Sequence, residues 1–391
     1  MGRVARIVVI GVAAVGFIVL LGFVTRLAFS GGDAAESAPS SALELHPLAG
    51  SFRPDDTELD SCDAAPCWEQ AFGNLAYNSG PQAALKLFDQ RLAADQAVEA
   101  GCHRIAHTIG SAALARYEGD VGQAFAEGSA SCWSGYYHGI LERALLDAQG
   151  DDQLVTVAQT VCSGDAVKTT TYLYYQCVHG LGHGLMIQTG LDLNRSLEVC
   201  EQLETQWDQT SCDGGVFMEN FSSSYSVRSR FIRGDDPVYP CNVVATRHKL
   251  YCYLQVTDRL LETSKYDWAD TARRCALVEV DWRSICFQSF GRSASGYSRP
   301  DGGLLMRLCN VPAKEWRSDC VYGAVRDIVS QDAGATRAAG FCHALAEEPL
   351  RERCFEGAGT ILATLARTPE ELREACARLS PRYADTCVGR A

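Results

Sequence analysis

The stretch Thr368–Arg390, TPEELREACARLSPRYADTCVGR, contains one complete copy of the unit that decides the fold. Pro369 opens a predicted helix whose first turn holds two glutamates, where the helix dipole favours negative charge. A Ser-Pro pair at positions 380–381 breaks this helix, and a second helix is predicted from about Tyr383. One cysteine lies late in the first helix and another lies early in the second. A disulfide between them would clamp the hairpin beside its turn.

The same pair of cysteines recurs along the chain with a regular period. The first cysteines of five units are separated by 34, 34, 33 and 34 residues, and each has a partner 11 or 12 residues later. These pairs are Cys241 with Cys252, Cys275 with Cys286, Cys309 with Cys320, Cys342 with Cys354, and Cys376 with Cys387. Cys200 with Cys212 has the same spacing, and Cys162 with Cys177 is a looser version. Adjacency alone pairs the remaining four as Cys102 with Cys132 and Cys62 with Cys67.

A period near 34 residues with two helices per unit resembles the architecture of tetratricopeptide and Sel1-like repeat proteins. The resemblance covers roughly residues 150–391 and concerns architecture and period alone, because the characteristic tetratricopeptide residues are not reproduced. It implies an all-α fold: a disulfide-clamped superhelix, or solenoid, of about eight to ten α/α hairpins. We divide the sequence that follows residue 60 into histidine-rich repeats at 61–190 and regular cysteine-paired repeats at 191–391.

A glycine follows the second-helix cysteine three residues later in five of the units. The pattern C-x-x-G appears as CWSG, CVHG, CDGG, CVYG and CFEG, which start at Cys132, Cys177, Cys212, Cys320 and Cys354. A glycine inside a helix costs about 1 kcal/mol relative to alanine, so its recurrence needs a reason. Close approach of neighbouring second helices is the simplest one, and it predicts that these helices form a tightly stacked inner layer.

The N-terminus predicts export and attachment to a membrane. Ile7–Val24 is an uncharged apolar run of 18 residues, preceded by two arginines. As a helix it would span about 27 Å, close to the thickness of a bilayer core, with its N-terminal end on the cytoplasmic side. We predict an uncleaved transmembrane anchor within residues 1–29. A signal peptide cleaved after this region, which would release a secreted protein, is the alternative. Residues 30–60 are rich in small and polar residues and predict a flexible linker.

Composition bounds the class of protein and its compartment. The net charge of −13 argues against binding of nucleic acid, which requires clustered lysine and arginine. The 18 cysteines are even in number, and no two of them form a CxxC motif, so zinc ribbons and thioredoxin-type redox sites lack their signature. Structural disulfides in an oxidising compartment outside the cytoplasm explain them best.

Histidines mark the one part of the sequence where chemistry is concentrated. Five of the eight histidines lie within residues 103–183, namely His103, His107, His138, His179 and His183. Four of them form two pairs spaced i, i+4, which places both rings of a pair on one face of a helix. Glu142 has the same relation to His138. Five tyrosines flank the cluster as candidate hydrogen-bond donors: Tyr136, Tyr137, Tyr172, Tyr174 and Tyr175.

The repeat register predicts that these histidines meet. His138 and His183 each lie six residues after the cysteine of a second helix, and His107 lies five after Cys102. Equivalent positions of successive repeats are neighbours in a solenoid, so three consecutive inner helices would direct imidazoles to one patch. Glu219, on the next inner helix, could join from the side. The glycines after His138 and His183 would leave room between the helices.

This arrangement favours a transition-metal site with copper, zinc or iron, held by the five histidines and Glu142. One ion with supporting residues, or two ions together, would fit this number of ligands. An open coordination position could activate water or dioxygen, which would make the protein a metalloenzyme. Two alternatives remain: a polar cluster that contacts a ligand without metal, and unrelated core histidines. If the histidines are structural, the chain is a non-catalytic scaffold that binds a protein or cell-envelope partner on its concave face.

Overall fold

The computed structural model describes residues 51–389 except residues 93, 130, 147, 149, 225–226, 299–301 and 332–335 and the side chains of residues 131 and 133. The chain separates into two units, Met1–Ser40 and Ser41–Ala391. The predicted membrane anchor and most of the predicted linker lie outside the described residues. Among the residues that are described, no helix is long and apolar enough to cross a membrane. The predicted division near residue 190 stays a prediction.

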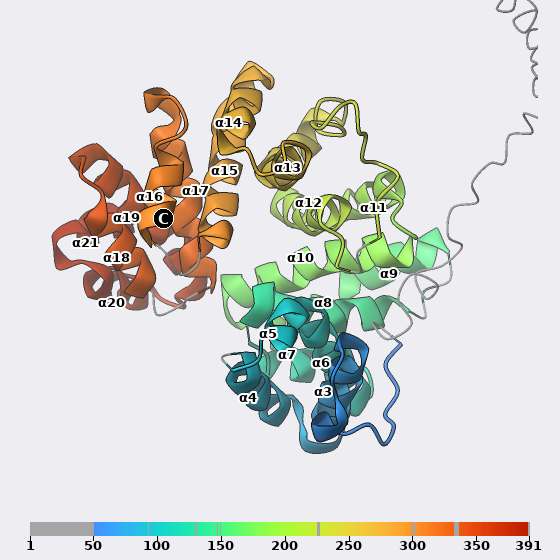
Figure 1. Cartoon of the computed structure of the whole chain (residues 1–391). Helices are drawn as coiled ribbons and strands as arrows, with labels where there is room; N and C mark the ends of the chain where they lie inside the picture. Colours follow the sequence, from blue (N-terminus) through green and yellow to red (C-terminus); the bar gives the residue numbers. More distant parts are fainter. Residues whose placement is uncertain are drawn as a thin grey trace, which may run out of the picture. The chain divides into compact units, whose positions relative to one another are not determined.

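The regular secondary structure of the described residues is helical, and Figure 1 follows it from α3 (blue) to α21 (red). Ten helices form an inner series in which each contacts the next. They are α3 (Ala65–Ser79), α6 (Cys102–Arg116), α8 (Ser131–Leu145), α10 (Thr171–Gln188), α12 (Gln206–Phe221), α13 (Lys249–Thr263), α15 (Arg283–Tyr297), α17 (Arg317–Gln331), α19 (Glu348–Leu365) and α21 (Ala384–Val388). The expected all-α repeat architecture is therefore present.

Shorter helices and turns connect the inner helices. The connecting helices are α4 (Pro81–Leu92), α5 (Gln96–Ala100), α7 (Val121–Ala126), α9 (Asp151–Thr160), α11 (Leu193–Cys200), α14 (Trp268–Leu277), α16 (Gly302–Cys309), α18 (Thr336–Ala344) and α20 (Pro369–Leu379). Six 3₁₀ turns complete the connections: η1 (Leu59–Ser61), η2 (Val167–Thr169), η3 (Thr246–His248), η4 (Val280–Trp282), η5 (Lys314–Trp316) and η6 (Pro381–Tyr383). Most of the later inner helices begin directly after such a turn.

Nine disulfides fix the hairpins. They join Cys62–Cys67, Cys102–Cys132, Cys162–Cys177, Cys200–Cys212, Cys241–Cys252, Cys275–Cys286, Cys309–Cys320, Cys342–Cys354 and Cys376–Cys387. These are the pairs expected from the spacing of the cysteines. Seven of the bonds close loops of 11–15 residues beside a hairpin turn, and the bond from Cys102 to Cys132 links the starts of two inner helices. Each should stabilise the fold by about 3 kcal/mol through the entropy of the unfolded chain.

Aromatic side chains repeat with the same period as the disulfides. In three units the residue after the inner-helix cysteine is a buried aromatic residue that stacks on the last residue of the next 3₁₀ turn. Tyr253 stacks on Trp282, Phe287 on Trp316, and Phe355 on Tyr383, with ring centroids 5.7, 5.0 and 4.4 Å apart. Every such pair connects one repeat to the following one. The core therefore runs from unit to unit as a continuous column.

The repeated glycines bring the inner helices into backbone contact. A Cβ atom added to Gly215 would overlap the carbonyl oxygen of His179, and one added to Gly323 would overlap that of Gln288. Gly180 differs, because its Cβ would make only ordinary contacts. The expected close approach of inner helices is thus found at Gly215 and Gly323, and also at Gly135, whose added Cβ would lie 2.8 Å from the carbonyl oxygen of His103. At Gly357 the added Cβ would overlap a side-chain atom of Val325 at 2.7 Å.

Candidate metal centre

Five imidazole rings meet where three consecutive inner helices pack together. Helix α6 carries His103 and His107, α8 carries His138, and α10 carries His179 and His183. The His138 ring lies at the centre of the group. Its centroid is 5.4 Å from His103, 5.3 Å from His107, 5.7 Å from His179 and 4.1 Å from His183. All five rings therefore lie together, as the repeat register predicted for His107, His138 and His183.

Two triads within this cluster have the geometry of a metal site. In the first, ligand atoms of His103, His107 and His138 lie within 4.8 Å of one another. The second combines His138 with His179 and His183 at the same spacing, so that His138 belongs to both triads. Four of the rings are at most 4% exposed, and His103 is half-buried. An ion held here would be largely shielded from solvent.

Glycine allows the helices of the cluster to come this close. A Cβ on Gly139 would overlap the carbonyl oxygen of His107, which shows that α8 runs directly against the backbone of α6. Gly215 likewise allows α12 to approach the backbone of His179 on α10. The room expected beside His138 is therefore occupied by a neighbouring backbone. Its effect is to bring imidazoles on separate helices within reach of one ion.

The outer nitrogens of three rings are engaged by fixed hydrogen-bond partners. Nδ1 of His107 lies 2.8 Å from Oε1 of Glu142, and Nδ1 of His183 lies 2.9 Å from Oε2 of Glu219. Nδ1 of His103 lies 2.8 Å from the carbonyl oxygen of Cys132. A ring that donates from Nδ1 to such an acceptor carries its lone pair on Nε2, which is the arrangement of metal-binding histidines. The Nε2 atoms of His103 and His107 face each other at 3.1 Å.

Other ring nitrogens in the cluster are buried without a hydrogen-bond partner among the described residues. Both nitrogens of His138 are in this state, and so is Nε2 of His183. Buried polar atoms are nearly always paired, because an unpaired one costs about 1–3 kcal/mol. A neutral His138 carries one lone pair and one N–H, so a cation bound to its unprotonated nitrogen and to Nε2 of His183 would remove part of that cost. The orphaned nitrogens are thus the part of the structure that points most directly to a metal.

Burial keeps four of the five histidines neutral at pH 7. Burial, reinforced by the neighbouring rings, lowers the pKa of His103 and of His107 to about 3. Burial and His183 likewise hold the pKa of His138 and His179 well below the ordinary value. Only the neutral imidazole can ligate a metal ion, so the environment favours the competent form.

Glu219 is held in place by the segment that follows α12. Its Oε1 accepts hydrogen bonds from Oγ of Ser223 and the backbone N–H of Ser224, at 3.0 and 2.8 Å. Its Oε2 accepts another from Oγ of Ser224 at 2.8 Å. Burial alone would raise the pKa of Glu219, but the bonds from His183 and Ser224 outweigh it and lower the pKa. This carboxylate is therefore ionised and ready to orient His183.

The roles of the carboxylates differ in part from the sequence-based expectation. Glu142 contacts Nδ1 of His107 and belongs to neither triad, so in this arrangement it orients a ligand. A direct bond from Glu142 to an ion stays a prediction. Glu219 contacts Nδ1 of His183 in the same way. The sequence predicts Glu219 only as a residue that could join the cluster from the side. The i, i+36 spacing of His183 and Glu219, close to the i, i+35 spacing of His107 and Glu142, is the signal that could have identified it.

Among the flanking tyrosines, Tyr175 contacts a histidine of the cluster. Its hydroxyl lies 3.3 Å from Nδ1 of His179, and the two rings stack with centroids 5.2 Å apart. The hydroxyl of Tyr251 on α13 donates in turn to that of Tyr175 at 3.4 Å. Tyr136 instead donates to the carbonyl of Ala124. Tyr251 was not anticipated, because only the curvature of the helix series brings α13 near α10.

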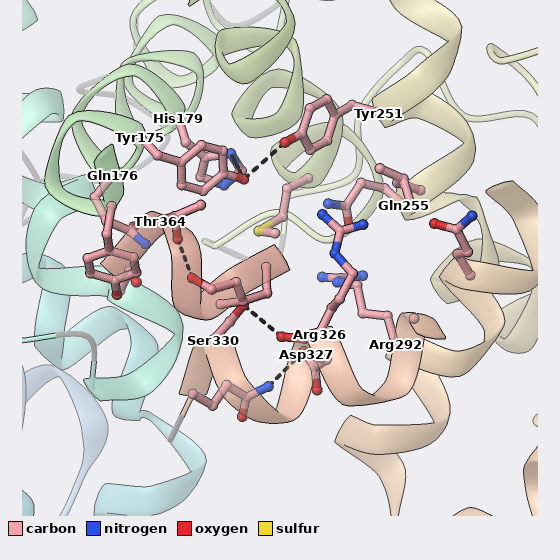
Figure 2. Close-up of a pocket in the computed structure, with 18 of the residues that line it drawn as sticks. Tyr175, Gln176, His179, Tyr251, Gln255, Arg292, Arg326, Asp327, Ser330 and Thr364 are labelled. Carbon is pink, nitrogen blue, oxygen red and sulfur yellow. Dashed lines mark hydrogen bonds between the residues drawn. The ribbon is translucent and has the colours of Figure 1, made fainter. Parts of the chain in front are cut away.

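Cavities reach the histidine cluster from two sides. One of about 310 Å³ has His138 and His179 in its wall (Figure 2). Another of about 650 Å³ has His103 and His183 in its wall. Small molecules of ordinary ligand size fit such volumes. An ion at the cluster would therefore be buried from bulk solvent yet open to a ligand.

Comparison of the chain with protein-family models, with curated proteins and with solved structures finds no match. The centre must therefore be interpreted from its own residues. The five rings are a set of nitrogen ligands held by outer hydrogen-bond partners, and the adjoining cavities provide space for a second molecule.

Proposed function

We propose that this protein is an extracytoplasmic metal-binding protein that holds one or two transition-metal ions at the five-histidine cluster. The observation that carries the proposal is the combination of two buried histidine triads with orphaned ring nitrogens at their centre. Hydrogen bonds from Nδ1 to Glu142 and Glu219 support it, because they increase the basicity of the rings and fix their orientation.

The donor set favours copper, zinc or iron. Neutral imidazole suits these ions, whereas magnesium and calcium require oxygen ligands. Either triad supplies three nitrogens to one ion, which leaves a coordination position for water or another small molecule. His138 would serve two ions at once only as an imidazolate, with its ring proton lost. Because cavities adjoin both triads, such a position would be accessible. A metal ion of this kind could activate water or dioxygen, so a metalloenzyme is the extended form of the proposal.

The compartment follows from the disulfides. Nine disulfides in a chain of 391 residues indicate an oxidising environment. We further propose that Ile7–Val24 tethers the folded part to a membrane, with residues 30–60 as the linker. The support for this tether is the length and apolarity of the segment and the two preceding arginines.

Metal analysis of the purified full-length chain tests the proposal. We expect one to two equivalents of copper, zinc or iron after equilibration with the ion and removal of excess. The double variant His107→Ala/His183→Ala removes one ligand from each triad and should bind less than a tenth as much. His343→Ala is the matched control, since His343 is exposed on α18 and should leave the metal content unchanged. Purified protein that takes up no ion would exclude the proposal.

One observation favours a second candidate, a scaffold that binds a protein partner. Three consecutive repeats expose an aliphatic residue two positions after the first cysteine of the pair: Val243, Leu277 and Val311, which are 64%, 81% and 39% exposed. Equivalent positions of neighbouring repeats form rows, and exposed apolar rows commonly serve as contact surfaces. If the chain remains free of metal and the histidine double variant is as stable as the wild type, the scaffold becomes the better account.

A further inference from the structure

The cavity of about 310 Å³ beside the histidines is lined by residues from seven inner helices. These helices are α8, α10, α12, α13, α15, α17 and α19. Helix α19 also contacts α10, although nearly two hundred residues separate them in sequence. The cavity is thus enclosed by the helix series itself. His138 and His179 form part of its wall, so whatever enters can approach the proposed metal centre.

The charge of this cavity is opposite to that of the whole chain. The net charge of the protein is −13, yet the formally charged residues that line the cavity are Arg292, Arg326 and Asp327, two cations against one anion. Both arginines extend from their helices into the cavity in Figure 2. Guanidinium groups stay charged in proteins, so the lining carries an excess of positive charge. An ion at the histidines would add to this excess.

The repeat itself places the two arginines together. Arg292 and Arg326 are 34 residues apart, which is one period, and they therefore occupy the same position on the neighbouring helices α15 and α17. Asp258, one period before Arg292, lies 3.1 Å from it and neutralises part of its charge. For Arg326, Nε is buried without a hydrogen-bond partner among the described residues. A donor in this state calls for an acceptor from a ligand.

Neutral groups in the wall complete a built site. Gln255 is 4% exposed, and its Oε1 has no hydrogen-bond partner within the described part of the chain. Tyr251, also in the wall, is joined to His179 through the hydroxyl of Tyr175. The positive charge of Arg292 also reaches the histidines, since it lowers the pKa of His179 after burial and His183. One side of the cavity therefore carries the two arginines, and the other borders the triads.

We propose that this cavity binds a small organic anion. A carboxylate or phosphate group would accept hydrogen bonds from Arg326 and Arg292, while Gln255 would contact a polar group elsewhere on the molecule. Planar guanidinium groups match both kinds of oxyanion, which often bind them in a bidentate manner. The remainder of the ligand would extend toward His138 and His179. This last point rests on the proposed function, whereas binding of the anion by the arginines does not.

Calorimetric titration of the purified full-length chain with inorganic phosphate, and separately with succinate, tests the proposal. The metal-free and the metal-loaded protein should each bind one equivalent of at least one of these anions. Arg326→Gln should weaken that binding about tenfold or more, because a charge-assisted hydrogen bond is lost. Succinamide, which has the length of succinate without its charge, should not bind. A preference for phosphate or for succinate then identifies which oxyanion the site accepts.

Arg378→Gln is the matched control. Arg378 is an exposed arginine on α20, outside the cavity, and its loss changes the net charge by the same amount. Equal affinities of the Arg326→Gln variant and the wild type would overturn the proposal, and so would an equal loss in both arginine variants. The metal content of the Arg326→Gln protein should stay at the wild-type value. Anion binding by a protein that takes up no metal would refute the metal centre alone, and metal uptake without anion binding would refute the cavity alone.

Discussion

Oε1 of Glu142 lies 2.8 Å from Nδ1 of His107, although the two residues are 35 positions apart and belong to different helices. The contact crosses from α8 to α6 and joins two successive layers of the repeat. Both side chains are buried. The same contact recurs between α12 and α10, where Glu219 contacts His183. A carboxylate from the next layer thus orients a histidine on each side of His138.

This relation predicts the effect of removing the carboxylate. Glu142→Gln keeps the size and one acceptor oxygen but loses the negative charge that increases the basicity of His107. We expect metal affinity to fall about 10- to 100-fold while the fold is kept. Competition with a chelator of known affinity measures the change. Glu374→Gln, on the exposed face of α20, is the control and should bind metal as the wild type does. Wild-type affinity in the Glu142→Gln protein would remove this residue from the site.

The contact between α6 and α8 depends on Gly139. In Gly139→Ala the added methyl group would overlap the carbonyl oxygen of His107, so the helices must separate. We expect a loss of about 1–3 kcal/mol in the free energy of unfolding, together with weaker metal binding. Gly340→Ala is the matched control in α18, where nothing lies within 4 Å of the added Cβ. That variant should be unchanged or more stable by up to about 1 kcal/mol. Denaturant titration of both proteins decides between these outcomes.

His248 predicts a dependence of stability on pH. It is the last residue of η3 and lies 2.7 Å from Asp213 and 2.9 Å from Glu201. In three later repeats this position holds a stacked aromatic side chain: Trp282, Trp316 and Tyr383. Burial would lower the pKa of His248, but the two carboxylates outweigh it and raise the pKa above the ordinary value of 6.5. The ion pairs therefore contribute fully below pH 6.5, and their contribution is lost as the pH rises through the raised pKa.

One variant tests whether the stabilisation by His248 decreases as the pH rises. His248→Gln should lower the free energy of unfolding by about 1–3 kcal/mol at pH 6 and by less at pH 9. Denaturant titrations at both values give the difference. His343→Gln, which changes an exposed histidine, should show no such contrast. A loss that is larger at pH 9 than at pH 6 would contradict the assignment of His248 as an ion-paired residue.

The disulfides predict local effects. In Cys376→Ala/Cys387→Ala, the last hairpin, α20 and α21, loses the clamp on a loop of 11 residues. We expect its amide hydrogens to exchange faster, consistent with a loss of about 3 kcal/mol. The metal content should not change, because the clamp lies far along the helix series from α6, α8 and α10. Loss of metal from this variant would show that the repeats unfold as one unit.

The repeat architecture could be predicted from the sequence because the cysteines recur with the period of the repeat. A disulfide requires its two Cα atoms to lie within about 7 Å. Regularly spaced cysteine pairs therefore predict regularly spaced hairpins whose two helices lie side by side. Register then placed His107, His138 and His183 together, since successive layers of a solenoid superpose equivalent positions. The roles of Glu142 and Glu219 were less predictable. An acceptor on Nδ1 and a ligand to metal lie on opposite sides of the same ring, and spacing alone does not distinguish them.

The cavity was beyond sequence reasoning. Its wall joins residues from α8 to α19, and the curvature that brings these helices together is the sum of small rotations at each layer. No local pattern encodes that sum. Arg292 and Arg326 do occupy one repeat position, but their approach to His179 depends on this curvature. The same limit applies to Tyr251, whose hydroxyl reaches Tyr175 across layers.

X-ray absorption spectroscopy of the zinc-loaded full-length protein tests the metal centre most directly. We predict a coordination shell with about three nitrogen atoms per ion at roughly 2.0–2.1 Å, together with the outer-shell scattering of imidazole rings. His138→Ala, which removes the ring common to both triads, should lose this signal. A shell made of oxygen or sulfur without imidazole scattering, or a spectrum unchanged in the His138→Ala protein, would contradict the five-histidine centre.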